Sequence, residues 1–403
     1  MSIQLPEEND LLVDVKEREE EERQRLFLVL LFLLLLLVCV GMLFFRYLRR
    51  PAPLPDLLPL SLNANYSPHY LFSIYGVDEP IGVALSPTGN RVYVTETGGE
   101  RLVKIFDQDG APLGSFAPPR TSQFGDRSPV YLATDSAGRV FVTDRVQHAI
   151  FVYDSDGNYL DTILGPDLTL SEYIFKHMDA PQTNYSFAYN LFEVNVHYRP
   201  AGSEDELTFP APDPVAWSPL GVRISETDQM LLTDVASANF NVVRVIPSDV
   251  VMAASWQEFD SPEIMLGEYG HGDGQFVFPN VAVSDSQGRI YVTDGNNGRV
   301  SIWDRTGRFL SHLGQGIGDG ALNLPRGAAI DTRDRLYVVD AVGQDVKVYD
   351  ISGPEADFLF TFGSWGVDNG QFNYPSDIAI DNNVTGRLYI ADRENHRIQV
   401  WLY

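Results

Sequence analysis

An acidic side chain closely followed by an arginine stands in the stretch "IYVTDGNNGRVSIWD", Ile290–Asp304. Asp294 and Arg299 could act as the acid and the cationic clamp of a catalytic site, because a carboxylate can move a proton and a guanidinium can hold an anionic group. β-branched residues flank the polar ones, so the stretch also fits two strands joined by a tight turn. Whether the pattern occurs once or many times decides between the two interpretations.

The pattern recurs along the chain. The clearest copies are "PNVAVSDSQGRIYVTDGNNGRVSIWDRTGRFLSHLG", "PRGAAIDTRDRLYVVDAVGQDVKVYD" and "PSDIAIDNNVTGRLYIADRENHRIQVW", and three further copies begin at Pro80, Pro129 and Pro219. Four strand-like runs at a period of roughly 45–50 residues are typical of a β-propeller blade. The last copy stops at its third strand, and "YLFSIYG" (Tyr70–Gly76) has the pattern of the missing outer strand. We therefore expect this N-terminal strand to close the ring, which leaves no exposed edge.

These copies resemble the NHL-repeat family of six-bladed β-propellers. The resemblance rests on the frame "P-x-x-[IV]-[AV]-x-D…G-[RI]-[IL]-Y-V-x-D…N-x-R-[IV]-x-[VI]-[WYF]" and on glycine-rich segments such as "YGHGDGQFVFP", and it covers residues 70–403 apart from one insertion. It implies an all-β fold of six four-stranded antiparallel blades, and the apolar run described below places a single N-terminal transmembrane helix before them. It implies function less specifically, since such propellers serve as binding platforms, sensors and occasionally enzymes.

The repeats separate framework residues from candidate site residues. A side chain that recurs at one position in every blade is expected to have the same role in each of them, and the role that all blades share is folding. Acidic residues recur at the end of the second strand, where they can accept hydrogen bonds from backbone N–H groups: Glu96, Asp144, Asp234, Asp294, Asp340 and Asp392. A second set recurs at the first turn: Asp135, Asp285, Asp331 and Asp381. We expect Arg101, Arg299 and Arg397 to pair with these carboxylates or to pack between blades.

Residues that depart from the repeat are the candidates for ligand binding. They stand directly after the proline of the innermost strand or directly after the recurring acid, near the expected mouth of the central channel. The candidates are Tyr131, Arg145, Asn280, Arg326, Asp377 and Arg393. The alternative is that short polar residues merely solvate a channel mouth.

Residues 165–213 form an aromatic-rich insertion between the second and third blades. The insertion joins an outer strand to the next inner strand, so we expect it on the same face as the channel mouth. Loops on rigid scaffolds often carry recognition. The alternative is an extra hairpin packed over a blade.

Composition and motifs narrow the chemistry. The net charge of −26 argues against nucleic acid, whose phosphates require cationic surfaces. No P-loop, GxSxG, HExxH or CxxC occurs, the histidines show no metal-ligand spacing, and Cys39 is the only cysteine. We assign no catalytic residue and no metal ligand. Calcium is possible at "GDG" 272–274 and 318–320, although Gly-Asp turns form without a metal.

The N-terminal segments predict attachment to a membrane. Residues 1–25 form a charged tail, 26–45 an apolar run of about 20 residues that could span a bilayer, and 46–68 a Pro-rich linker before the propeller at 69–403. A cleaved signal peptide is the alternative, but the run is long and "RYLRRP" follows it. We expect a single-pass protein with its N-terminus in the cytoplasm and its propeller outside.

The sequence thus favours a membrane-anchored binding or sensing module over an enzyme. The channel-mouth face would take a protein, peptide or glycan ligand, and a membrane-protein partner is possible because the cytoplasmic tail is too short to signal alone. The alternative is a metal-dependent hydrolase or lyase with its site in the central channel.

Overall fold

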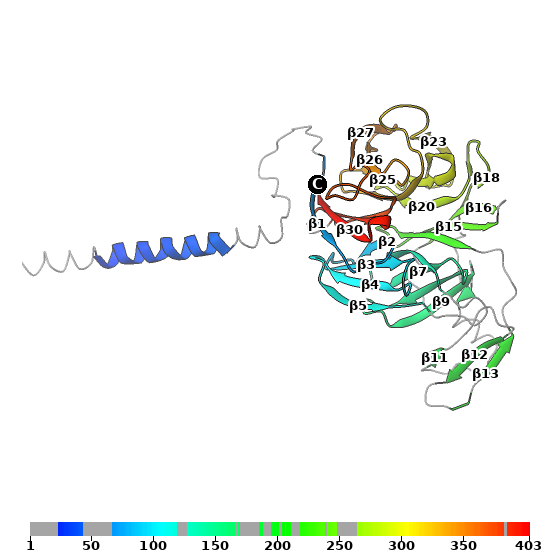
Figure 1. Cartoon of the computed structure of the whole chain (residues 1–403), viewed down its shortest axis with the longest axis horizontal. Helices are drawn as coiled ribbons and strands as arrows, with labels where there is room; N and C mark the ends of the chain where they lie inside the picture. Colours follow the sequence, from blue (N-terminus) through cyan, green and yellow to red (C-terminus); the bar gives the residue numbers. More distant parts are fainter. Residues whose placement is uncertain are drawn as a thin grey trace, which may run out of the picture. The chain divides into compact units, whose positions relative to one another are not determined.

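The computed structural model describes residues 23–42, 67–118, 127–165, 168–169, 185–187, 195–200, 204–205, 207–210, 218–237, 240–247, 264–382 and 385–403. The chain divides into two compact units, Met1–Leu54 and Pro55–Tyr403. The first contains one described helix, Arg23–Met42, which is long and apolar enough to cross a membrane (Figure 1). This property fits a membrane anchor and a signal sequence alike. Residues 43–45 of the predicted span lie outside the described residues.

The second unit is a ring of six four-stranded antiparallel sheets, the blades of a β-propeller (Figure 1). Blades one and two contain β2 (Pro80–Leu85), β3 (Arg91–Glu96), β4 (Val103–Asp107) and β5 (Pro112–Phe116), then β6 (Pro129–Thr134), β7 (Val140–Asp144), β8 (Ala149–Tyr153) and β9 (Tyr159–Gly165), which β10 (Leu168–Thr169) extends. Blades three and four contain β14 (Pro219–Ile224), β15 (Met230–Ser237), β16 (Phe240–Ile246) and β17 (Ile264–Leu266), then β20 (Pro279–Ser284), β21 (Ile290–Asp294), β22 (Arg299–Trp303) and β23 (Phe309–Leu313). Blade five contains β24 (Pro325–Ile330), β25 (Arg335–Asp340), β26 (Asp345–Asp350) and β27 (Asp357–Phe362).

Blade six confirms the predicted closure of the ring. It contains β28 (Pro375–Ile380), β29 (Arg387–Asp392) and β30 (Arg397–Leu402), and its fourth strand is β1 (His69–Ile74). β1 pairs antiparallel with β30, with His69 opposite Leu402 and Ile74 opposite Ile398. We call the end of the ring at which the innermost strands begin the mouth face. Because neighbouring strands alternate in direction, the chain enters the propeller at His69 on the end opposite to the mouth face.

Short elements complete the described chain. The insertion contains a three-stranded sheet of β11 (Tyr185–Phe187), β12 (Asn195–Pro200) and β13 (Leu207–Pro210). Its aromatic side chains and its predicted place on the mouth face lie outside the described residues. A two-stranded parallel sheet of β18 (Glu268–Tyr269) and β19 (Gln275–Phe276) precedes blade four, and 3-10 turns η1 (Gly295–Asn297) and η2 (Arg393–Asn395) follow β21 and β29.

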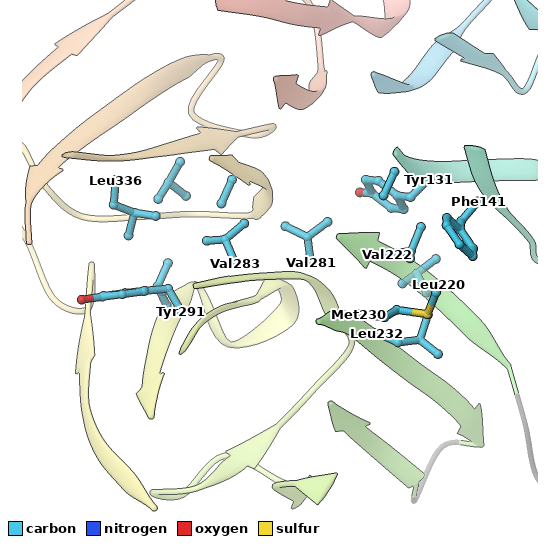
Figure 2. Packing of buried hydrophobic residues seen from close by; sticks show 14 of the residues in the cluster. Tyr131, Phe141, Leu220, Val222, Met230, Leu232, Val281, Val283, Tyr291 and Leu336 are labelled. Atoms are coloured by element: carbon cyan, nitrogen blue, oxygen red, sulfur yellow. The ribbon is translucent and has the colours of Figure 1, made fainter. Parts of the chain in front are cut away.

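The core lies between the blades, which explains the near-continuous apolar runs of the second and third strands. β7, β8, β21 and β22 are buried at every residue. Figure 2 shows part of the largest cluster, to which neighbouring blades contribute side chains such as Val222 of blade three and Val281 and Tyr291 of blade four. Each blade therefore buries its faces only against its two neighbours, and the closed ring gives every blade both of them.

Two local features set the spacing of the innermost strands. Gly221 and Gly327 allow close approach, because a Cβ at Gly221 would overlap the carbonyl oxygen of Asn280 and one at Gly327 would overlap the carboxylate of Asp377. A threonine before the recurring acid joins consecutive blades. The Thr293 hydroxyl accepts the N–H of Val281 at 3.0 Å in its own blade and donates to the carbonyl of Arg326 at 2.6 Å in the next. Thr95, Thr143 and Thr233 make the same connection.

Candidate ligand-binding site at the channel mouth

The recurring acid of blade four is a framework residue, as predicted. Asp294 is fully buried and accepts a hydrogen bond from the backbone N–H of Val277 at 2.7 Å. Its other oxygen accepts from Asn297 at 2.7 Å and from Arg299 at 2.9 Å. The carboxylate thus connects its own turn to the segment that leads into the blade. A substrate could not reach it.

The remaining repeated residues follow the same rule. Each recurring acid accepts a backbone N–H from the segment that leads into its blade, and the donors are Asp78, Ser128, Ser218, Leu324 and Asn373. Asp135, Asp285, Asp331 and Asp381 accept N–H groups of their own turns. Arg397 pairs with Asp392 at 2.8 Å, whereas Arg101 donates to the carbonyls of Thr97 and Arg127 and so connects blades one and two. The framework interpretation of these sets is confirmed.

The candidate residues after the prolines stand on a local irregularity. In every innermost strand the pairing register shifts directly after the proline, for example between Pro129 and Leu132 and between Pro325 and Ala328. A bulge re-aims the side chains that it carries and is common at barrel rims. These positions can therefore differ between blades without disturbing the ladder below them.

A pocket of about 240 Å³ opens at the channel mouth. Four of the six candidates line it, namely Tyr131 and Arg145 of blade two, Arg326 of blade five and Arg393 of blade six. Its other lining residues are Ile81, Thr97, Ser128, Val130, Tyr374 and Ser376. Asn280 and Asp377 are not among the lining residues, and both are fully buried.

Tyr374 holds two of the arginines side by side. Its ring centroid lies 5.9 Å from the guanidinium carbon of Arg326 and 5.9 Å from that of Arg393. Arg326 also donates to the Tyr374 hydroxyl at 3.0 Å and to Asn280 Oδ1 at 2.8 Å. Arg145 stacks over Phe278 at 5.4 Å. Stacking on aromatic faces suits the planar guanidinium and offsets part of the repulsion between like charges.

An ion pair spans the central channel beside this pocket. Asp377 of blade six pairs with Arg223 of blade three, and its second oxygen accepts the N–H of Val83 at 3.0 Å. Burial raises the pKa of Asp377, and the charge of Arg223 opposes that shift. The guanidinium of Arg223 lies 6.0 Å from the centroid of the Tyr131 ring. Asp377 therefore holds a cation in place across the ring.

Arg223 escaped the sequence reasoning, although a signal was present. It is the fifth residue of its innermost strand, and the other blades have small or β-branched residues there: Ala84, Ala133, Val283, Ala329 and Ala379. A comparison of the six blades at this position, like the one made after the prolines and the recurring acids, would have identified Arg223.

Several donors around the pocket have no acceptor among the described residues. The Tyr131 hydroxyl and the Nε atoms of Arg326 and Arg393 are buried and make no hydrogen bond with the described residues. Tyr131 is only 1% exposed, and in Figure 2 its hydroxyl end points away from Phe141. Burial raises the pKa of Tyr131, with smaller and partly opposing effects from Arg326, Asp377 and Arg223, so its hydroxyl stays protonated at neutral pH. Buried polar groups without partners are rare and call for an explanation.

Metal ligation finds no support in the described part of the chain, where no group of three or more His, Cys, Asp or Glu side chains could hold an ion. The pocket instead offers hydrogen-bond donors and positive charge.

Comparisons with known proteins agree with the fold. Residues 277–303 and 372–401 match the NHL repeat family. No curated protein matches the sequence. A selenomethionine-substituted virginiamycin B lyase from Staphylococcus aureus is similar in structure, with 11% identity, a TM-score of 0.50 and coverage of 84% of this chain and 99% of the lyase. A Bacteroides thetaiotaomicron protein of unknown function has 14% identity, a TM-score of 0.49 and coverage of 83% of this chain and 72% of its own. At these identities the likeness concerns the fold alone. The chain is a six-bladed β-propeller that contains NHL repeats and is preceded by an apolar N-terminal helix.

Proposed function

We propose that this chain is a membrane-anchored binding module that captures a protein or peptide partner at its mouth face. One observation carries the proposal: arginines of three different blades gather in one pocket of a chain with a net charge of −26. They stand where the blades depart from the repeat, so the folding of a blade does not require them. Local positive charge on an acidic protein steers and orients a complementary partner.

Exposed apolar residues on the same face support a protein or peptide rather than a glycan. They lie on the segments that lead from an outer strand to the next innermost strand. Ile317 and Trp365 are 106% and 73% exposed, and Tyr75 and Val367 are also well exposed. Large exposed apolar side chains with polar surroundings are typical of protein interaction surfaces.

The apolar helix is proposed to remain as an anchor, with the N-terminus in the cytoplasm. The chain enters the propeller at His69, on the end of the ring opposite to the mouth face. A tag at the N-terminus should stay with the propeller in membranes washed with alkaline carbonate. Release of a propeller without the tag would identify a cleaved signal sequence instead.

The binding proposal is tested by capture from native membranes with the tagged full-length chain. We expect a partner that co-purifies with the wild type to be recovered about tenfold less with Arg326→Gln and Arg145→Gln, since a hot-spot side chain contributes at least about 1.4 kcal/mol. Arg308→Gln is the matched control, because Arg308 is 75% exposed on a turn of blade four and pairs there with Asp304. Equal recovery with all variants would show that the mouth pocket is not the binding site.

A further inference from the structure

The charges at the mouth pocket do not cancel. Among the described residues, the lining contains three guanidinium groups and no carboxylate. Glu79 and Glu394 each contact Arg393, at 3.0 and 3.1 Å, but both are more than a third exposed, where water weakens an ion pair. Arg145 and Arg326 form no ion pair with a described carboxylate, and Asp377 is already paired with Arg223. The pocket thus has excess positive charge.

The same pocket has donors in need of an acceptor. A buried donor without a partner lowers the stability of the folded chain, and three such groups lie here among the described residues: the Tyr131 hydroxyl and the Nε atoms of Arg326 and Arg393. A bound oxyanion could accept from them and offset the charge in one step. Water could satisfy the donors but not the charge.

We infer that the mouth pocket binds a carboxylate of the partner, either its C-terminus or an acidic side chain. The inference rests on the proposed function and names the group that the proposed site recognises. Guanidinium groups match the planar fork of a carboxylate, and Ile81 and Val130 supply an apolar wall for the carbon atoms next to it. The volume of about 240 Å³ is below the ~300–1,000 Å³ of pockets that take whole small molecules, so it suits the end of a chain or a single side chain.

Small probes test the inference without knowledge of the partner. The full-length chain in detergent is titrated with N-acetyl-leucine and with N-acetyl-leucinamide, which has nearly the same shape without the charge, and binding is followed by calorimetry. We expect the acid to bind at least about tenfold more tightly than the amide. Arg145→Gln and Arg326→Gln should abolish this preference, and Arg308→Gln should keep it.

A second probe distinguishes the two sources of a carboxylate. N-acetyl-glutamic acid α-amide carries only a side-chain carboxylate, whereas N-acetyl-leucine carries only a terminal one. Tighter binding of the former identifies an acidic side chain, and tighter binding of the latter a C-terminus. Either result supports the inference.

Tyr131→Phe separates ligand binding from a structural role. The Tyr131 hydroxyl has no partner among the described residues, so its removal should leave the melting temperature unchanged or raise it. Binding of the carboxylate should weaken about tenfold, because a hydrogen bond to a charged group is lost. A merely structural hydroxyl would give the reverse, a lower melting temperature with unchanged binding.

Three results would overturn the inference: equal binding of acid and amide, no binding of either carboxylate probe, or tighter binding of inorganic phosphate than of both. These failures differ from failure of the proposed function. If partner capture depends on Arg326 while the carboxylates do not bind, the binding function stands and the carboxylate assignment falls. If the carboxylate probes bind while partner recovery is the same with the pocket variants, the carboxylate site exists but the captured partner does not bind there.

Discussion

Blade four and the channel mouth use the same kinds of residue in opposite ways. Within blade four, Asp294 and Arg299 form an ion pair with each other, and both also form hydrogen bonds with backbone atoms nearby. Asp392 and Arg397 repeat this arrangement in blade six. At the mouth, Arg326 stands at a position that holds no arginine in the other blades, and Arg393 at one that holds arginine only in blades two and six; each keeps a buried nitrogen without an acceptor among the described residues. A charged pair that is repeated and saturated belongs to the fold. A charged group outside the repeated framework, with a hydrogen-bond donor that has no partner among the described residues, is where a ligand can bind.

The pair of Asp377 and Arg223 combines both properties, since it is unique in the ring and yet saturated. We expect Asp377→Ala to lower the free energy of unfolding by about 4 kcal/mol, because it leaves the buried charge of Arg223 without a counterion. Urea unfolding of the full-length chain, followed by tryptophan fluorescence, measures the loss. Combining the change with Arg223→Ala should recover part of the lost free energy. A loss below about 1 kcal/mol for Asp377→Ala alone would mean that the pair, like the other mouth residues, is not needed for folding.

Asp294→Ala tests the saturated side of the comparison. We expect a loss of about 3 kcal/mol, smaller than for Asp377, because Arg299 keeps the backbone carbonyls of His271, Gly272 and Gln275 as acceptors. The same unfolding experiment applies. Binding of N-acetyl-leucine should be unchanged in the folded variant, and a specific loss of binding would mean that the repeated acid has a role beyond folding.

Thr293→Val sharpens the comparison within the framework. The hydroxyl of Thr293 connects blade four to Arg326 of blade five, so its removal should cost about 1 kcal/mol. Blade five has Val339 at the equivalent position, so a valine before the recurring acid is compatible with a blade of this ring. A loss above about 3 kcal/mol would indicate that the threonine hydrogen bonds between consecutive blades act cooperatively around the ring.

Arg145→Gln has the smallest expected effect on stability, within about 0.5 kcal/mol, because Arg145 makes no ion pair with a described carboxylate. Partner recovery should nevertheless fall. Thermal unfolding and capture from membranes, measured on the same preparation, check both halves. A large destabilisation with intact capture would make Arg145 a framework residue.

Much of the fold was predictable because the repeats control for one another. Six copies of a four-strand pattern predicted six blades, and the truncated last copy predicted that Tyr70–Gly76 would complete the ring, as β1 does. The acids at one repeated position could be assigned to folding without coordinates. For the apolar helix the sequence predicted the type of element, and the described helix Arg23–Met42 includes residues 26–42 of the predicted span.

The site was only partly predictable. Departure from the repeat selected Tyr131, Arg145, Arg326 and Arg393, which meet at one pocket, but the same rule selected Asn280 and Asp377, which are buried and hold arginines in place. Arg223 and Tyr374 were missed. Arg223 pairs with Asp377 of another blade, and Tyr374 contacts Arg326 of blade five, so both partners lie far away in the sequence.

The sequence by itself determined the blade, its repetition and the residues that each blade needs, because local periodicity and recurrence are properties of the chain. Only the tertiary structure decided which of the unusual residues share a pocket and which donors lack an acceptor. Closure of the ring brings blades two, five and six together at the mouth, and the reach of each long side chain across that space sets its partners. The spacing of residues along the chain does not give the distances between side chains of different blades across the channel.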